Sequence, residues 1–492
     1  MVRRLFIIYA AAFTVLLAQN AWCVSPNLTN ILPRGGARGS EVEVRFVGSK
    51  LGDSVDLIFH DTGITLVEIK EAAGDHVTCV LGLAPDCRVG AHAIRVRTLT
   101  GASNLRLFSV GTLTELSETE PNNDPAAAQS VELGTTVNGI VTNEDADYFA
   151  VELNEGDSIA VEIEALRLGT TLFDPKLRLF GPQGHELLAE DDTALMKQDA
   201  AFVHTARESG RYLVAVTEAS YGGSASSYYR LHIGAFPRPL AVTPMGGLPG
   251  TATQLRWLGD PALETSEVVL PEGEPGLRAI TISSEAGIAP TPMPFLLSEW
   301  PGVMESEPND TRENATAGTV PGAFDGVVQE DGDVDWYSFE GSKGQAIRIR
   351  VWARALGSPL DSVMTLVGPN GAEVASDDDG AGMDSTVRVT LPEDGTYLLS
   401  VRDHLRRGGA TFAYRIHVGP VKQELTLSIP DMEAASMVVA RGNRSVFVLG
   451  TTRSNFDGPL TIEFVDLPAG VTAEYGVIPA GQTRIPVLLT AA

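Results

Sequence analysis

The chain has 492 residues, of which 43% are hydrophobic and 20% charged, so it is long enough for several folded domains. At roughly 100 to 150 residues per domain, we expect three to five of them. The formal net charge of -27 repels phosphate backbones, which argues against a nucleic-acid-binding protein.

The first 23 residues predict a signal peptide. Arg3 and Arg4 precede an almost unbroken apolar run over residues 5–18, and a small residue, Ala21, stands near the expected cleavage site. A retained membrane anchor is the alternative, although the run is shorter than the roughly 18 apolar residues that a span requires. No second long apolar run follows. We therefore predict a secreted, periplasmic or cell-surface protein with no membrane span after signal removal.

Residues 24–110 form the first small unit, which we expect to be an immunoglobulin-like β-sandwich. Its motif at 32–36 (LPRGG) is echoed at 243–247 (TPMGG). Once the signal is removed, Cys79 and Cys87 are the two remaining cysteines. An even pair in an exported protein predicts one local disulfide bond, and the alternative is two separate buried thiols.

Residues 111–235 and 304–420 are two copies of one larger unit. Each copy begins with an acidic run, 118–124 (ETEPNND) or 305–310 (ESEPND). The same later motifs follow in the same order: 147–149 and 335–337, 181–184 and 368–371, 210–212 and 395–397, and 229–234 and 414–419. A repeated module therefore organises the chain.

The residue pattern inside the two copies predicts β-strands. Apolar and polar residues alternate over 158–165 (SIAVEIEA) and 345–352 (QAIRIRVW), so one face of each strand can be buried. Glycine and proline at 181–184 and 368–371 predict hairpin turns. The predicted fold class is all-β, with tandem antiparallel β-sandwiches, immunoglobulin-like and jelly-roll-like, in a multidomain chain. The last strand of each copy carries a histidine, and we expect outward, solvated imidazoles at His232 and His417.

Two oxygen-rich clusters in each copy predict a calcium site. Alternate side chains of an extended segment share a face, so Glu118, Glu120 and Asn122 point the same way. A second cluster stands on a short loop further along, at 143–147 in one copy and 331–335 in the other. Calcium takes about six to eight oxygen ligands, which two such clusters could supply when folded together. The alternative is that both clusters are solvated loops of an acidic protein.

These motifs resemble a known family. Glu-x-Glu-Pro-Asn-(Asn/Asp), Asp-(Tyr/Trp)-(Phe/Tyr) and the Gly-x-Tyr strand are similar to those of the bacterial pre-peptidase C-terminal domain, found on secreted proteases and many other exported proteins. The resemblance covers residues 113–235 and 304–420, and it implies a β-sandwich. By analogy with collagen-binding members, it also implies calcium held by the acidic run and the aspartate loop. Carried over to this sequence, the implied ligands are Glu118, Glu120, Asn122, Asn123, Asp145 and Asp147, and Glu305, Glu307, Asn309, Asp310, Asp333 and Asp335.

The first copy departs from the pattern at one position. Asn123 stands where the second copy has Asp310, and we expect the lower charge to weaken the first site. Residues 24–110 resemble TIG domains, and residues 236–303 resemble a degenerate immunoglobulin-like or TIG-like domain. Residues 421–492 are expected to form another immunoglobulin-like unit that is cut short or continues beyond Ala492.

Motifs of common catalytic sites are missing from the sequence. It has no His-Glu-x-x-His, no Gly-x-Ser-x-Gly and no Gly-x-x-x-x-Gly-Lys-(Ser/Thr). We therefore expect no enzyme activity and weigh two functions. The first is an exported, calcium-stabilised, non-catalytic binding, adhesion or cell-surface structural protein whose partner is an extracellular polymer or protein. The second is the accessory region of a secreted hydrolase, in particular a protease, whose catalytic domain lies outside these residues.

Overall fold

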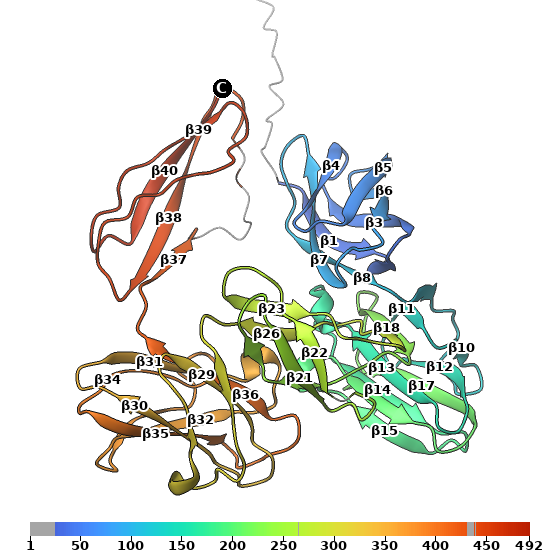
Figure 1. Cartoon of the computed structure of the whole chain (residues 1–492). Coiled ribbons are helices and arrows are strands. Elements are labelled where there is room, and N and C mark those ends of the chain that lie inside the picture. The colour runs from blue at the N-terminus through green and yellow to red at the C-terminus, as the bar shows by residue number, and fades with distance from the viewer. Residues whose placement is uncertain (1–24, 264, 431–436, 438) are drawn as a thin grey trace, which may run out of the picture.

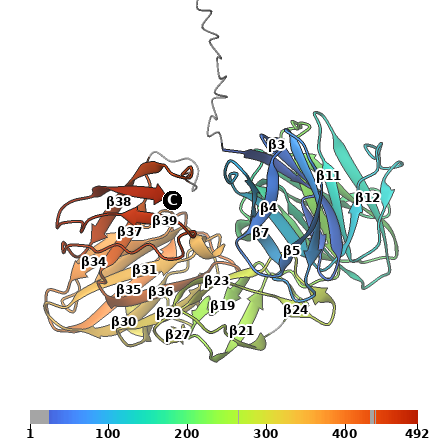
Figure 2. The same cartoon turned by 90° about the horizontal axis from the view of Figure 1, so that it is seen from above.

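The computed structural model describes residues 25–263, 265–430, 437 and 439–492. The fold is 51% strand and 3% helix, which confirms the predicted all-β class and the tandem β-sandwiches. Sheets follow one another along the chain as consecutive units (Figures 1 and 2). The predicted signal peptide, residues 1–23, lies outside the described residues.

The first unit, the N-terminal sandwich, has two four-stranded sheets around one apolar core. Its strands are β1 (Asn27–Leu32), β2 (Gly35–Ala37), β3 (Glu41–Ser49), β4 (Ser54–Phe59), β5 (Ile64–Ala72), β6 (His76–Leu83), β7 (Gly90–Thr98) and β8 (Arg106–Gly111). The sheet orders are β1-β3-β6-β5 and β2-β8-β7-β4. Side chains such as Phe46 and Phe108 fill the space between the sheets.

The predicted disulfide bond between Cys79 and Cys87 is not formed, and both residues are buried free thiols. Cys79 lies in the middle of β6 and packs in the core between the two sheets. Cys87 lies in the loop after β6, where its Sγ is 3.9 Å from Nε2 of His92. The sequence spacing did not reveal that the two side chains point to different neighbours. Burial raises the pKa of the Cys79 thiol to about 12.

Two larger units, module one (residues 114–234) and module two (residues 302–420), each contain two five-stranded sheets. Module one has β9 (Thr114–Ser117), β10 (Gln129–Ser130), β11 (Thr135–Ile140), β12 (Ala146–Leu153), β13 (Ser158–Glu164), η1 (Leu166–Leu168), β14 (Pro175–Phe180), β15 (Glu186–Glu190), η2 (Ala194–Met196), β16 (Ala201–Thr205), β17 (Gly210–Glu218) and β18 (Tyr228–Gly234). Module two has β27 (Gly302–Met304), η3 (Arg312–Asn314), β28 (Thr316–Ala317), β29 (Gly322–Val327), β30 (Asp335–Gly341), β31 (Ala346–Trp352), η4 (Arg354–Leu356), β32 (Ser362–Val367), β33 (Glu373–Asp377), β34 (Thr386–Thr390), β35 (Gly395–Asp403) and β36 (Ala413–Pro420).

The two modules have the same sheet topology. The orders β10-β12-β17-β14-β15 and β16-β13-β18-β11-β9 in module one correspond to β28-β30-β35-β32-β33 and β34-β31-β36-β29-β27 in module two. The strands predicted at 158–165 and 345–352 are confirmed as β13 and β31. The predicted hairpins join β14 to β15 and β32 to β33. Each module has its own apolar core.

A middle unit separates the two modules, and a single sheet follows module two. The middle unit has β19 (Ala241–Thr243), β20 (Gly246–Gly247), β21 (Ala252–Leu258), β22 (Thr265–Val269), β23 (Gly276–Ile280), β24 (Ser283–Ser284), β25 (Gly287–Ile288) and β26 (Met293–Leu297). The C-terminal sheet, in the order β37-β38-β40-β39, has β37 (Glu424–Ser428), β38 (Arg444–Ser454), β39 (Val471–Glu474) and β40 (Arg484–Ala491). Leu195 and Met196 of module one pack into the core of the middle unit.

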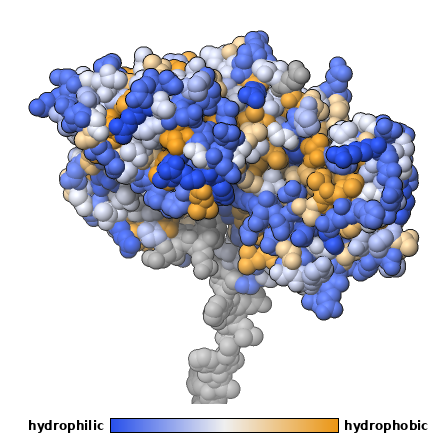
Figure 3. Space-filling model, turned by 90° about the horizontal axis from the view of Figure 1, so that it is seen from below, coloured by the Kyte–Doolittle hydropathy of each residue, from blue (hydrophilic) through white to orange (hydrophobic). Residues whose placement is uncertain are grey.

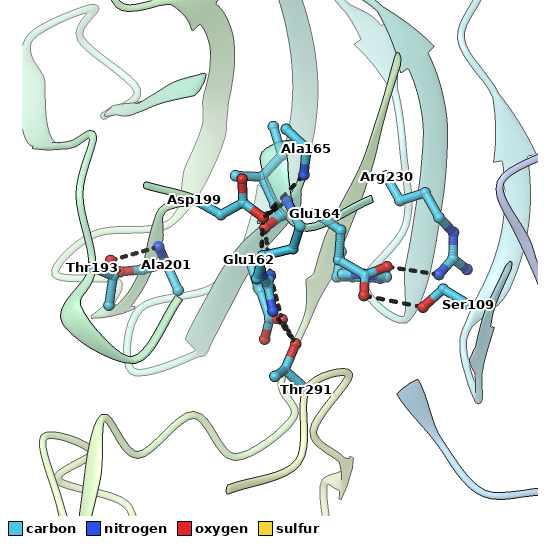
Figure 4. Close-up of polar contacts among 12 residues, drawn as sticks. Ser109, Glu162, Glu164, Ala165, Thr193, Asp199, Ala201, Arg230 and Thr291 are labelled. Carbon is cyan, nitrogen blue, oxygen red and sulfur yellow. Dashed lines mark hydrogen bonds and ion pairs between the residues drawn. The ribbon is translucent and has the colours of Figure 1, made fainter. Parts of the chain in front are cut away.

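Buried polar contacts also join module one to both of its neighbours (Figure 4). Arg238 Nη1 lies 2.7 Å from Oε2 of Glu162, and both side chains are fully buried. Thr291 of the middle unit donates a hydrogen bond to the other oxygen of Glu162. On the same outer face, Ser109 of the N-terminal sandwich donates to Glu164 at 3.0 Å. The outer face of sheet β16-β13-β18-β11-β9 is therefore an interface rather than a solvated surface.

This interface overturns the expectation of a solvated imidazole at His232. The side chain is 1% exposed, with Nδ1 2.8 Å from the Thr136 hydroxyl and Nε2 3.3 Å from Glu164. His417 in module two is half-buried and lies beside Trp300 of the segment that precedes β27. Both histidines point outward from their own sheet, but neighbouring units bury His232 fully and cover His417 in part.

None of the helices in the described part of the chain combines the length and the apolar character needed to cross a membrane. The face of the molecule in Figure 3 carries apolar patches that hydrophilic side chains interrupt.

Candidate metal centres

Hydrogen bonds hold each acidic run against the first strands of its module. The Asn122 carbonyl accepts from the Tyr148 amide of β12 at 3.0 Å, and the Asn309 carbonyl accepts from the Trp336 amide of β30 at 3.1 Å. The first glutamate of each run is held in the same way. Oε1 of Glu118 accepts from the Ile140 amide, and Oε1 of Glu305 accepts from the Val327 amide, each at 2.8 Å.

The two oxygen-rich clusters of each module meet in space. Carboxylate oxygens of Glu305, Glu307 and Asp335 all lie within 4.8 Å of one another in module two. The same holds for Glu120, Asp145 and Asp147 in module one. The structure therefore brings together segments that are separated by more than twenty positions in the sequence.

A tyrosine hydroxyl lies beneath each cluster, a contact that the residue pattern did not predict. Tyr229 is fully buried and donates to Asp147 Oδ2 at 2.7 Å, and its hydroxyl is 3.0 Å from Glu118 Oε2. Tyr414 is the equivalent residue in module two and donates to Asp335 Oδ2. Both tyrosines begin the same repeated motif, 229–234 and 414–419, and this was the signal that could have identified them.

Burial and mutual repulsion make the clustered carboxyl groups difficult to ionise. Burial is the main cause that raises the pKa of Asp335 to about 9 and that of Glu305 to about 7, and neighbouring carboxylates add to it. The pKa of Asp333 rises to about 6 for the same main reason. In module one, burial raises the pKa of Asp147 to about 8 and that of Glu118 to about 7. A bound cation would remove this penalty by compensating the negative charges.

Module two also contains buried polar atoms that have no hydrogen-bond partner. Those at the candidate site are Oδ1 of Asp333, Oδ1 of Asp335 and both side-chain amide atoms of Asn309. Buried polar groups in folded proteins are almost always paired, so such a group of unpaired atoms needs an explanation. Carboxylate and amide oxygens are the ligands that calcium prefers. The residues of module two therefore fit a calcium ion, which Glu305, Glu307, Asn309, Asp333 and Asp335 would hold. Asp310 lies beside Asp333 and adds negative charge at the edge of this group.

Module one satisfies more of the corresponding atoms without an ion. Asp145 accepts hydrogen bonds from the side chain of Asn123 and from the amide and hydroxyl of Thr142, the latter two at 3.0 and 2.9 Å. The side-chain oxygen of Asn122 faces carboxylates. When the oxygen and nitrogen of this amide exchange places, the NH2 group donates to Asp147 Oδ1 at 3.1 Å and to Glu120 Oε2 at 3.3 Å. Module one therefore has less need of a cation than module two.

The raised pKa values predict a pH dependence for the metal-free protein. The folded state retains protons that the unfolded chain releases, so the free energy of unfolding should fall as pH rises. The loss should begin above the ordinary carboxyl pKa of about 4 and continue to about 9, the pKa of Asp335. Its slope is about 1.4 kcal/mol per pH unit for each proton that only the folded state retains. Urea unfolding in chelator between about pH 5 and pH 9 measures it.

Excess calcium should flatten this profile, because a bound ion keeps the carboxylates ionised in the folded state. A metal-free profile that is level, or that rises, across this range would contradict the prediction. Glu164 acts in the opposite direction at lower pH, because hydrogen bonding to His232 and the charge of Arg230 outweigh burial and lower its pKa. Above about pH 5 Glu164 no longer titrates. Burial lowers the pKa of His417 to about 3, which opposes the trend up to about pH 6.5, so the fall is expected to be clearest between about pH 7 and pH 9.

Comparison with known proteins places a family within module two. The model of the bacterial pre-peptidase C-terminal domain matches residues 333–403. Among curated proteins, a segment of 102 residues is 38% identical to a probable subtilase-type serine protease of Deinococcus radiodurans. That segment is 19% of this chain and only 14% of the length of the protease.

Two solved structures are similar to parts of the chain. The pre-peptidase C-terminal domain of collagenase from Bacillus anthracis is 18% identical, covers 22% of this chain and 99% of that domain, and has a TM-score of 0.19. PliG of Aeromonas hydrophila, a periplasmic inhibitor of g-type lysozyme, is 20% identical, covers 21% and 96% of the two chains, and has a TM-score of 0.17. Residues 333–403 therefore resemble the bacterial pre-peptidase C-terminal domain, and Asp333 and Asp335 of the candidate site lie at the start of the matched residues.

Proposed function

We propose that this chain is an exported, non-catalytic region that calcium stabilises. The observation that carries the proposal is the group of unpartnered buried atoms on Asn309, Asp333 and Asp335. A cation bound there would fasten the acidic run to strand β30 and would close the entry of the chain into module two. In this proposal calcium has a structural role, since Asn309, Asp333 and Asp335 are buried in the module and only Glu307 of the proposed ligands is exposed.

We further propose that modules one and two are both pre-peptidase C-terminal domains, separated by immunoglobulin-like or TIG-like units. Their identical sheet topology and paired acidic clusters support this. The proposed divisions are 24–110, 111–235, 236–303, 304–420 and 421–492. The first site would be the weaker, because Asn123 replaces a carboxylate and hydrogen-bonds Asp145.

For the role of the region, we favour the accessory part of a secreted protease over a free-standing adhesion protein. The curated relative carries the name of a subtilase-type serine protease. The family that matches module two is described as pre-peptidase. In this proposal the chain itself has no peptidase activity, and the catalytic domain belongs to another part of the protein or to another chain.

Metal analysis of the purified chain tests the proposal. After treatment with chelator and dialysis against calcium chloride, we expect one tightly bound calcium ion in module two and a weaker one in module one. Asp335→Asn should remove the tight ion, because it removes a buried charge from the centre of the site. Casein incubated with the chain should stay intact. A chain that retains no calcium contradicts the metal proposal, and cleavage of casein contradicts the accessory role.

A further inference from the structure

A second concave site lies between the middle unit and module two. The cavity has a volume of about 370 Å³. The end of strand β26 lines one side of it, and the outer face of strands β31 and β36 lines the other. The aromatic and basic residues that line it are Trp300, Trp352, His417, Arg348, Arg350 and Lys422. Basic groups thus gather at one cavity of a chain whose net charge is strongly negative. None of these residues belongs to the candidate metal centres.

Arg350 is the most unusual of the lining residues. Its guanidinium lies 3.6 Å from the centre of the Trp352 ring, and it forms no ion pair with any residue that the structure describes. The Nε atom of Arg350 and the indole Nε1 atom of Trp352 are buried without a hydrogen-bond partner. Two unsatisfied N–H donors on adjacent side chains of one cavity need an acceptor, and the protein supplies none there.

The acidic residues at the rim are already paired with other cations. Glu424 lies 3.3 Å from Arg388 and also pairs with Arg348. Glu299 pairs with Lys422, whose ammonium lies 5.4 Å from the centre of the Trp300 ring. Arg350 therefore remains as the cation that is available to a ligand.

In module one, residues of the middle unit cover the position that corresponds to Arg350. Arg350 lies opposite His417 in the β31–β36 pair, as Glu162 lies opposite His232 in the β13–β18 pair. Arg238 pairs with Glu162. Thr291 of the middle unit donates to the other oxygen of the same carboxylate (Figure 4). At the equivalent place module two has the opposite charge. The segment before β27 places Trp300 there, and its carboxylate at the cavity, Glu299, pairs with Lys422 rather than with Arg350.

The chemistry of the cavity selects a ligand with one carboxylate and an apolar body. An arginine fork binds a carboxylate through two hydrogen bonds, and the neighbouring indole rings favour apolar or planar groups. The volume is at the low end of ligand sites, which suits one or two amino-acid residues. Polyanions are disfavoured, because the net charge of -27 repels them.

We propose that this cavity binds the C-terminal end of a peptide whose last residue is apolar. The terminal carboxylate pairs with the Nη groups of Arg350, and the last side chain packs against Trp300. Peptide-bond hydrolysis is the class of reaction that creates new ends of this kind. The site does not depend on calcium, so it can be tested separately from the metal centres.

Titration calorimetry of the whole chain with acetyl-Gly-Phe tests the proposal, with the C-terminal amide of the same peptide as the matched ligand. We expect the free acid to bind with a Kd of about 1 mM or lower and the amide to bind at least about tenfold more weakly. Arg350→Gln should weaken binding of the acid at least about tenfold, and Arg350→Lys should give an intermediate loss. Arg402→Gln, on strand β35 in the other sheet of module two and outside the cavity lining, should bind normally.

Comparison of acid and amide uses the unaltered chain, so a variant that fails to fold does not weaken the test. Equal affinity for the two peptides, or no heat from either, would overturn the proposal. Binding of an oligogalacturonate in place of the peptide would also overturn it and would assign the cavity to an acidic glycan. Chelator should leave peptide binding unchanged, and this separates failure of the metal proposal from failure of this one.

Discussion

Calcium is expected to raise the melting temperature of module two, and Asp335→Asn is expected to remove most of that rise. The Asp335 side chain is fully buried, with one oxygen unpartnered and the other held by Tyr414. An ion that binds only the folded state adds about 2.7 kcal/mol at a hundred times its Kd. For a unit of about 100 residues this corresponds to roughly 10 to 20 °C. Scanning calorimetry of the whole chain, in calcium and in chelator, measures the rise.

The matched control is Asp379→Asn. It removes one negative charge from an exposed turn of the same module, at a distance in sequence from the acidic run. This variant should keep the full response to calcium, whereas Glu307→Ala should lose most of it. A response that Asp379→Asn also loses would indicate a general charge effect. A melting curve of the unaltered chain that chelator does not change would remove calcium from module two.

The duplicated motifs allowed much of the candidate site to be predicted from the sequence. The acidic run and the aspartate loop recur at nearly equal spacing in both copies, and the structure brings them together in each. Alternation of apolar and polar residues located strands such as β13 and β31 because one face of each is buried in its own module. These are local patterns, which a single sequence carries.

The contacts between units could not be predicted from the sequence. Arg238 and Glu162 are 76 positions apart, and nothing near either residue indicates its partner. The outer faces of β13 and β18 carry polar residues, which in an isolated sheet would meet water. Here neighbouring units cover them, so His232, which was expected to be solvated, is buried together with Glu164. Cys79 and Cys87 were misassigned for a related reason, because spacing alone does not give the direction of two side chains.

Replacing Arg238 by alanine is expected to destabilise the junction of module one with the middle unit by about 3 to 5 kcal/mol. The variant leaves the carboxylate of Glu162 buried, with Thr291 and the more distant Arg167 as its remaining side-chain partners. A buried charge that loses its main partner costs more than the pair contributed, because its desolvation is no longer compensated. Urea unfolding of the whole chain measures the change as a lower midpoint of the transition that contains module one.

Removing both charges separates this cost from the contribution of the pair. The double variant Arg238→Met with Glu162→Gln should recover at least half of the lost stability, since no uncompensated carboxylate remains. Arg97→Ala breaks an exposed pair with Asp56 in the N-terminal sandwich and should leave the unfolding midpoint nearly unchanged. If Arg238→Ala unfolds at the same urea concentration as the unaltered chain, Glu162 is not held in a closed interface, and the junction between the two units must open readily to water.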